Sequence, residues 1–267
     1  MVLQKTLKLL KSKYSAHMEN LFISDVVMGM HLTAVKLSDG SHGVASTLQD
    51  RIYHSAGKKR DFGPFTPMQI TGQRVMDLFE TSQKSKITDS LKVAVLNAVS
   101  TKIIAKGKYK AIENADPIDL LDLSQPKTIT IVGAFHSYIE KLSGSDNRLF
   151  VLEMNEDALG EEHKKYYVPA NDYNNVIPGS DVLIITGLTL VNNTIDDLLL
   201  SVPENCRVIV TGPSGSIIPD VLFQHGVHII GATRIIKPRE LFDVVAQGGS
   251  GYHLFKYCAE KICILNE

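Results

Sequence analysis

The sequence has no tryptophan, and only three of its 267 residues are cysteines. Three cysteines cannot all pair with one another, and Cys206, Cys258 and Cys263 lack the Cys-x-x-Cys spacing of structural zinc sites. We therefore expect neither a disulfide framework nor a zinc centre, and we expect a reduced, cytoplasmic protein.

An excess of charge of one sign is also missing, because 28 Lys and Arg face 29 Asp and Glu, a formal net charge of −1. A nucleic-acid binder usually presents a concentrated basic surface, which this balance does not favour. No apolar run approaches the roughly 18–20 residues of a membrane-spanning helix. The best one, residues 182–191, is interrupted by Thr186, Gly187 and Thr189. We therefore expect no nucleic-acid partner and no membrane span.

The first part of the chain shows mixed periodicity. Leucines alternate with lysines over residues 1–14, which indicates an amphipathic helix on the protein's own core, with a membrane-surface helix as the alternative. Two apolar-rich runs, residues 25–37 and 41–48, flank Ser38-Asp39-Gly40 and predict an antiparallel hairpin. Residues 71–102 follow with helical spacing and an N-cap candidate at Thr88-Asp89-Ser90.

A different rhythm begins after a junction at residues 106–127, where Asp116-Pro117 starts a short helix. Short β-branched runs then alternate with helical stretches. The runs are residues 128–133, 148–153, 166–169, 181–186, 207–212 and 228–231, and the helical stretches are residues 137–142, 193–200 and 219–225. This alternation predicts a parallel sheet with right-handed crossovers. We predict an α+β domain over residues 1–110 and a Rossmann-like α/β domain over residues 111–267.

Open parallel sheets bind ligands at the carboxyl ends of their strands, so site candidates are sought there. Gly133 permits a sharp turn into a helix whose amino terminus can bind an anion, and Phe135 and His136 follow in that turn. His136 is our candidate general acid–base. Glu153 ends the next strand, where an acidic residue binds ribose hydroxyls in nucleotide folds; a solvated glutamate is the alternative. A single glycine here disfavours NAD(P).

Small residues follow two later strands. Thr186 ends the fourth run, and Gly212-Pro213-Ser214 follows the fifth and can form an anion-binding nest or oxyanion site. Ser214 is a candidate nucleophile, although the Gly-x-Ser-x-Gly pattern fails at Ser216. Tight strand-to-helix turns are the alternative in both places. A glycine-rich stretch at residues 247–251 indicates a backbone that approaches a neighbour closely or a flexible loop.

Several strings together resemble a two-domain family of unknown function associated with heavy-metal chelation. They are VVMGMHLTAVKL, GVASTL, TDSLKVAVLNAVS, TITIVGAFHSYIEKL, RLFVLEMN and RVIVTGPSGSIIPDVLFQHGV. The resemblance covers nearly the whole chain and implies an enolase amino-terminal-like domain followed by a Rossmann-like domain, with a site between them. Its motif positions fall on Asn97, Gly133, Phe135, Glu153, Gly212, Pro213 and Ser214. Gly215 and Ser216 replace the threonine and proline that the family pattern expects.

The resemblance implies a protein that handles a small-molecule ligand or a metal chelate. One hypothesis is an enzyme acting on a small anionic, pterin-like or siderophore-like chelator in an interdomain cleft. Its catalytic candidates are His136, Ser214 and Asn97, with Arg51 or His54 closing the site. The alternatives are a non-catalytic metal or metal-chelate binding protein and a methyltransferase-like protein that binds a nucleoside or S-adenosylmethionine. No cofactor and no metal ligands are assigned, and a homo-oligomer is left open.

Overall fold

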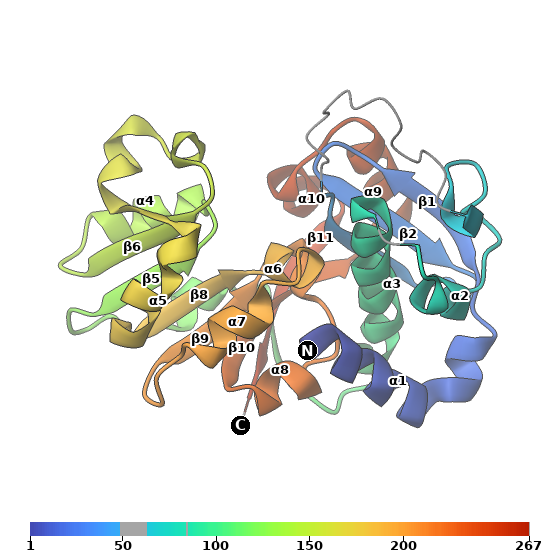
Figure 1. The fold of residues 1–267 in the computed structure, drawn as a ribbon, viewed down its shortest axis with the longest axis horizontal. Helices are drawn as coiled ribbons and strands as arrows, with labels where there is room; N and C mark the ends of the chain where they lie inside the picture. Colours follow the sequence, from blue (N-terminus) through green and yellow to red (C-terminus); the bar gives the residue numbers. More distant parts are fainter. Residues whose placement is uncertain (49–62, 84, 267) are drawn as a thin grey trace.

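The computed structural model describes residues 1–48, 63–83 and 85–266, which form two sheets surrounded by helices (Figure 1). The strands are β1 (Ile23–Met28), β2 (Leu32–Leu37), β3 (His42–Ser46), β4 (Lys110–Glu113), β5 (Thr128–Val132), β6 (Arg148–Glu153), β7 (Tyr167–Pro169), β8 (Val182–Thr186), β9 (Arg207–Thr211), β10 (Val227–Ile235) and β11 (Ala259–Leu265). The α-helices are α1 (Val2–Glu19), α2 (Val75–Glu80), α3 (Lys86–Ala105), α4 (His136–Ser143), α5 (Tyr173–Val176), α6 (Leu188–Val191), α7 (Ile195–Leu200), α8 (Asp220–Gln224), α9 (Pro238–Ala246) and α10 (Gly251–Tyr257).

The larger sheet has the order β4-β11-β10-β9-β8-β5-β6-β7. From β10 to β7 all neighbours are parallel, and β5, the first of these strands in the chain, lies in the middle. This is the strand order of a Rossmann fold. The strands are apolar along their length because helices cover both faces, as β8 shows with four buried residues followed by Thr186. The predicted parallel Rossmann-like sheet is confirmed.

The sheet also carries two antiparallel strands that the sequence pattern did not predict. β11 pairs with β10, placing Lys261 opposite Thr233, and β4 pairs with β11 at the edge. The last strand of the chain therefore lies between β10 and a strand from the junction segment. This arrangement brings residues near position 116 close to residues near position 261.

The smaller sheet, β1-β2-β3, is antiparallel and packs on α3. The predicted Asp39-Gly40 hairpin joins β2 to β3, with Gly40 at φ +80°. The run at residues 25–37, however, is two strands rather than one. The chain turns after Gly29, whose N–H donates to the Leu32 carbonyl. This position requires glycine, because a Cβ there would meet the carbonyl oxygen of Val245 at 2.1 Å.

The start of α3 also differs from the prediction. Its N-cap is Ser85, three residues before the predicted Thr88. The Ser85 hydroxyl accepts from the Thr88 N–H, and the Thr88 hydroxyl accepts from the Ser85 N–H, each at 3.0 Å. The two side chains form a capping box, so Thr88 lies within the first turn of the helix.

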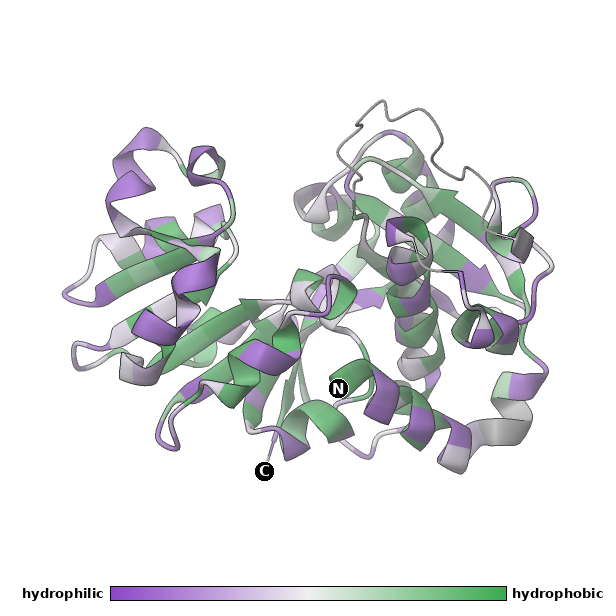
Figure 2. Ribbon diagram, viewed as in Figure 1, coloured by the Kyte–Doolittle hydropathy of each residue, from purple (hydrophilic) through white to green (hydrophobic). Residues whose placement is uncertain are grey.

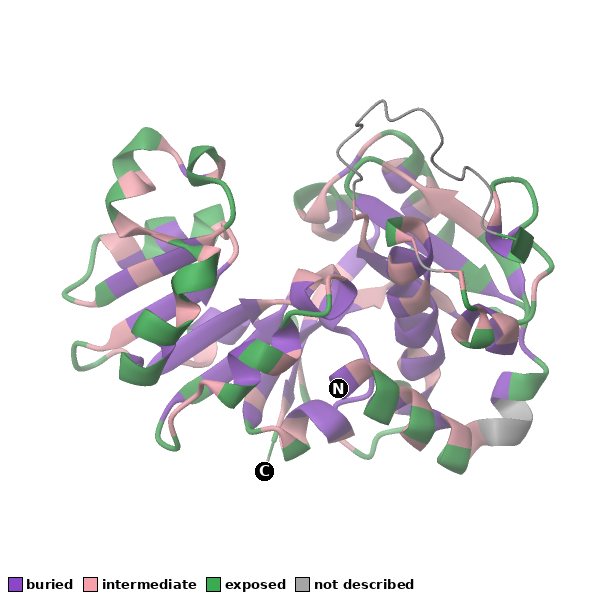
Figure 3. Cartoon of the chain, viewed as in Figure 1, coloured by how far each residue is buried: buried purple, intermediate pink, exposed green. Residues whose placement is uncertain are grey.

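One hydrophobic core joins the two predicted domains. It contains Leu10 of α1, Leu96 of α3 and Val210 of β9, and α3 is buried over most of its length (Figure 3). The apolar strands at its centre are green in Figure 2. The leucine stripe of α1 thus packs on the protein's own core, as expected. The domain boundary near residue 110 stays a prediction.

The last helices of the chain return to the first sheet. α9 packs on β1 and β2, and Leu241, Val245 and Leu254 share a buried cluster with Leu32 and Val44. In Figure 1 the red helices α9 and α10 accordingly lie beside the blue sheet, while α4 and β6 lie at the other end of the molecule. The central strands of the larger sheet connect the two ends.

Candidate functional site

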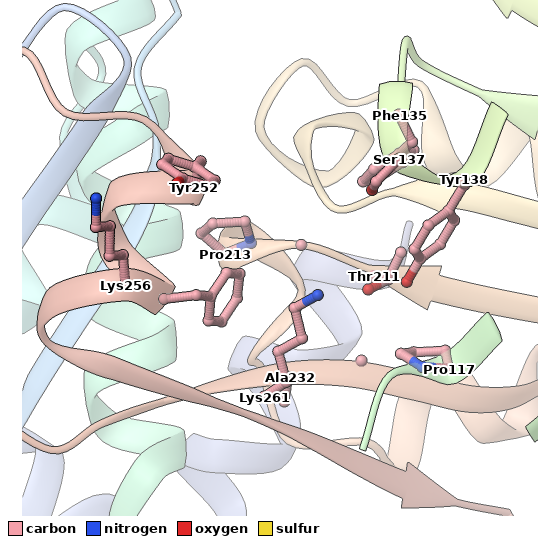
Figure 4. Close-up of a pocket in the computed structure, with 14 residues that line it drawn as sticks. Pro117, Phe135, Ser137, Tyr138, Thr211, Pro213, Ala232, Tyr252, Lys256 and Lys261 are labelled. Atoms are coloured by element: carbon pink, nitrogen blue, oxygen red, sulfur yellow. The ribbon is translucent and has the colours of Figure 1, made fainter. Parts of the chain in front are cut away.

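A cavity of about 630 Å³ lies between α4 and α10, over the C-terminal end of β9 and the middle of β10 (Figure 4). This volume lies in the usual range for small-molecule sites, about 300–1,000 Å³. Phe135 and Tyr138 form one wall, and Tyr252 and Phe255 of α10 form the opposite wall. Every described residue that lines the cavity comes from residues 117–261, so the described N-terminal residues do not line it.

The floor of the cavity carries a polar cluster centred on Asp116. This carboxylate accepts a hydrogen bond from the hydroxyl of Tyr138 and another, at 2.5 Å, from the Lys261 ammonium. Asp116 also caps the short 3₁₀ helix at Pro117–Leu120, which confirms the predicted role of Asp116-Pro117 as its start. The ammonium of Lys261 has three donors, so two remain for a ligand. In Figure 4 it points across the floor toward Tyr138 and Thr211.

Burial raises the pKa of Tyr138, and the neighbouring Asp116 carboxylate raises it further. The phenol therefore stays protonated and donates to Asp116. Because the neutral Tyr138 hydroxyl already donates its proton to Asp116, it can hold Asp116 in place and accept a hydrogen bond from another group. It is poorly suited to remove a proton from a ligand. The cluster thus offers an anion contact at Lys261 rather than a general base.

Two lysines and no carboxylate are among the described residues that line the cavity. Asp116 lies behind Lys261, whose side chain is 42% exposed against 16% for the aspartate. Lys261 also lies 5.3 Å from the ring centroid of Phe255, and Lys256 lies 5.8 Å from that of Tyr252. The α10 side of the cavity therefore combines cationic and aromatic groups.

Three of the residues predicted from the sequence line this cavity: Phe135, Gly212 and Pro213. Gly133 and Thr186 lie at the ends of β5 and β8, where a Rossmann fold usually binds a dinucleotide. A Cβ at Gly133 would lie 3.1 Å from Thr186 Cγ2 and 3.9 Å from Phe135 Cε2. The side chains of Thr186 and Phe135 thus lie close to Gly133, and the cavity lies farther along the sheet, at β9 and β10.

The remaining candidates of the first loops lie elsewhere. Glu153 Oε2 accepts from the Ala134 N–H at 3.1 Å, and its Oε1 accepts from the Met154 N–H at 2.7 Å. Both oxygens hold backbone groups, one of them in the turn after β5. His136 is exposed at the first position of α4 and is not among the residues that line the cavity.

Ser214 and Asn97 lie together behind the cavity wall. Ser214 is fully buried, and its hydroxyl oxygen accepts from the Ser46 N–H at 2.8 Å. The side-chain amide of Asn97 donates to the carbonyls of Val44 and Pro213. Neither side chain lines the cavity. Two further candidates, Arg51 and His54, lie outside the described residues.

Sequence patterns did not predict Asp116, Tyr138, Lys261 or helix α10 as parts of the site. Asp116 was identified only as a helix cap, and Tyr138 matched the apolar spacing of its helix. The glycine-rich stretch at residues 247–251 was the one signal for α10. Its last glycine, Gly251, begins α10 and lines the cavity.

The described residues do not fit a directly bound metal ion. Within residues 1–48, 63–83 and 85–266, no group of three or more His, Cys, Asp or Glu side chains could hold one. The cysteines are buried apart from one another, and burial raises the pKa of Cys206 and Cys263 to about 12 and that of Cys258 to about 11. Such thiols stay protonated at neutral pH and are poor metal ligands. In the described part of the chain, no helix combines the length and the apolar character needed to cross a membrane.

Two family models match this chain, and both are described as "Putative heavy-metal chelation". The DUF364 model covers residues 116–264, more than half of the chain, and the DUF4213 model covers residues 11–100. No protein of curated function matched.

Two crystal structures of DUF364 proteins of unknown function have the same fold over the whole chain. The protein from Pyrococcus horikoshii is 20% identical with a TM-score of 0.76, and the alignment covers 99% of this chain and 98% of that one. The protein from Desulfitobacterium hafniense DCB-2 is 17% identical with a TM-score of 0.73, and 98% and 99% of the two chains are covered. Together with the residues that the family models match, these findings show that the chain belongs to the DUF364 family.

Proposed function

We propose that this protein binds a small organic anion with a flat ring in the cavity between α4 and α10. The observation that carries the proposal is the arrangement of the walls around the Lys261 ammonium. Aromatic rings stand on two sides of the cavity, and Lys261 presents free donors at its floor. Aromatic walls favour a flat ring, and an ammonium in a largely apolar cavity favours a carboxylate or a similar anion.

The family description concerns heavy-metal chelation, and the described residues supply no metal ligand set. We therefore propose that a metal, where one takes part, reaches this site bound to the organic ligand. Flat aromatic acids with further oxygen or nitrogen donors are chelators of this kind. The aromatic walls would contact the ring, while Lys261 would contact an anionic group.

We propose binding here and no chemical step. A nucleoside or methyl donor bound through Glu153 has less support, since both oxygens of that carboxylate already accept backbone hydrogen bonds. For His136 and Ser214, no contact with the cavity supports a catalytic role. The Lys261 cluster is the arrangement that a binding experiment should address first.

Fluorescence titration with 2-naphthoate tests the proposal. The chain lacks tryptophan, so emission from indole side chains does not overlap that of the probe. We expect saturable binding, and we expect Lys261→Ala to weaken it about tenfold, the value of one charge-assisted hydrogen bond. Fully saturated decalin-2-carboxylate, which has the charge without the aromatic ring, should compete poorly.

Lys13→Ala is a matched control. Lys13 contacts Asp220 at 3.3 Å, and Asp220 also accepts from the Tyr109 hydroxyl at 2.6 Å. This second Tyr–Asp–Lys cluster is not among the residues that line the cavity. Equal loss of affinity in Lys13→Ala and Lys261→Ala, or no saturable binding to the wild type, would overturn the proposal.

A further inference from the structure

The loop that forms the back wall of the cavity is fastened to the N-terminal half of the chain. This loop, residues 212–218, contains Gly212 and Pro213, which line the cavity. Hydrogen bonds connect it to β3 and α3, among them the bond from the Ser214 hydroxyl to the Ser46 hydroxyl at 3.0 Å and three that involve backbone groups. These three join Asn97 Nδ2 to the Pro213 carbonyl at 3.1 Å, the Ser46 N–H to Ser214 Oγ at 2.8 Å, and the Ile218 N–H to Ser100 Oγ at 2.9 Å.

Asn97 occupies an unusual position for an amide. It lies in the middle of α3 with 1% of its surface exposed, and its Oδ1 has no hydrogen-bond partner among the described residues. A buried acceptor without a partner costs free energy comparable with a lost hydrogen bond. The two donors of the same amide are both used, on the carbonyls of Val44 and Pro213. The structural contribution of Asn97 therefore comes from its donors.

The position of Pro213 affects both sides of the cavity. The residue lines the cavity directly, and a Cβ at Gly251 would lie 3.8 Å from Pro213 Cγ. Gly251 is the first residue of α10, whose side chains Tyr252 and Phe255 form the far wall. A displacement of Pro213 thus changes the back wall and the helix that packs against it.

We propose that Asn97 is a positioning residue for the ligand site. It sets the affinity of the cavity through the Pro213 carbonyl, although it does not itself line the cavity. Through this contact the N-terminal half of the chain contributes to a site lined entirely, among the described residues, by the C-terminal half. The inference rests on the proposed function, because affinity for the anion is what Asn97 would control.

Titration of Asn97→Leu with 2-naphthoate tests this inference. Leucine has a similar size and lacks the unpartnered oxygen, but it removes the amide donor from the Pro213 carbonyl, which then keeps, among the described residues, only the longer bond from the Ser216 hydroxyl at 3.4 Å. We expect affinity to fall about tenfold, within the range of energetic coupling through packed neighbours. Ser100→Ala is the matched control. It removes another link between α3 and the same loop, at Ile218, which does not line the cavity, and it should leave affinity within about twofold of wild type.

Thermal unfolding of the same variants separates positioning from stability. Both substitutions remove a buried hydrogen bond and should lower the melting temperature, whereas only Asn97→Leu should lower affinity. If Asn97→Leu does not fold, Asn97→Ser replaces it in the titration. The serine side chain is too short to reach the Pro213 carbonyl in the same way, so we expect the same loss of affinity. If a folded Asn97 variant binds 2-naphthoate as tightly as the wild type, the role proposed for Asn97 is wrong. The proposed function still holds in that case, provided that Lys261→Ala weakens binding. Absence of binding to the wild type overturns both.

Discussion

The ring of Phe135 stacks on the ring of Tyr138, with 5.3 Å between their centroids and 21° between their planes. The two residues lie at the turn into α4 and in its first turn. The Phe135 ring lies near Gly133 at the end of β5, and the Tyr138 hydroxyl donates to Asp116 at the floor of the cavity. The stacked pair therefore connects the turn after β5 with the polar cluster at the floor of the cavity.

Phe135→Ala tests the role of this stacked pair. Loss of the ring removes a cavity wall and the partner of Tyr138, and a stacked aromatic pair contributes about 0.5–1.5 kcal/mol beyond its buried area. We expect weaker 2-naphthoate binding and a lower melting temperature. His163→Ala is the control, since His163 also stacks on a tyrosine, Tyr166, and does not line the cavity. Unchanged affinity in Phe135→Ala would contradict the assignment of this wall.

Gly231→Ala tests how closely the cavity floor is packed. A Cβ at this position would lie 2.3 Å from Thr211 Oγ1 and 2.6 Å from Pro117 Cγ, so both must shift. Overpacking of this kind lowers the free energy of unfolding by about 1–3 kcal/mol, and the shift should also weaken ligand binding. Chemical denaturation measures the first effect. Gly144→Ala, where a Cβ meets nothing within 4 Å, should cost far less, and equal effects in the two variants would contradict the geometry.

Asp39 at the β2–β3 turn should contribute stability that depends on pH. Burial alone would raise the pKa of Asp39, but hydrogen bonds from Lys102 and Ser41 outweigh it and lower the pKa from 3.8 to about 2. A lowered carboxyl pKa stabilises the fold above the unfolded value of 3.8. This stability is lost as pH falls from 3.8 to about 2.

Asp39→Asn should therefore lower the free energy of unfolding by about 1 kcal/mol at neutral pH. This value is smaller than the pKa shift alone would give, because Lys102 is partly exposed and solvent screens its interaction with Asp39. Denaturation at several pH values should show the difference from wild type shrinking below pH 3.8. Asp119→Asn is the control, because it breaks the ion pair between Asp119 and Lys141. The Asp119 side chain is 57% exposed, against 14% for Asp39, so this substitution should lower the free energy of unfolding by less. If the effect of Asp39→Asn on the free energy of unfolding did not change with pH, the lowered pKa of Asp39 could not be its cause.

Ser214→Ala tests whether Ser214 serves the fold. The substitution leaves the Ser46 N–H without its acceptor, and we expect a loss of about 1–3 kcal/mol in the free energy of unfolding. Because Ser214 is fully buried, a serine-directed organophosphorus reagent should not label it in the folded protein. Stoichiometric labelling of Ser214 would show instead that it is an accessible nucleophile.

Much of the larger sheet follows from the sequence, because strands covered on both faces must be apolar throughout and because helices must separate parallel strands. The prediction failed where strands and helices no longer alternate along the chain. β11 is an antiparallel strand that includes Lys261 and Glu260, and it follows two helices and a glycine-rich stretch. Periodicity gave no sign that this strand would lie beside β10.

The candidate site was predictable only in part, for the same reason. Phe135, Gly212 and Pro213 could be found because they directly follow predicted strands. Asp116 and Lys261 are 145 positions apart in the chain and meet because β11 inserts next to β10. Such contacts depend on strand order, which spacing along the sequence does not specify.

A crystal structure of the 2-naphthoate complex would show directly whether the cavity between α4 and α10 binds the anion. We expect the naphthalene ring between Phe135 and α10, with its carboxylate within hydrogen-bond distance of Lys261 Nζ. We also expect this density to be lost in crystals of Lys261→Ala grown under the same conditions. Naphthoate bound instead in the smaller cavity of about 330 Å³ beside Leu7 and Leu96, or in the same pose without Lys261, would contradict the proposed function.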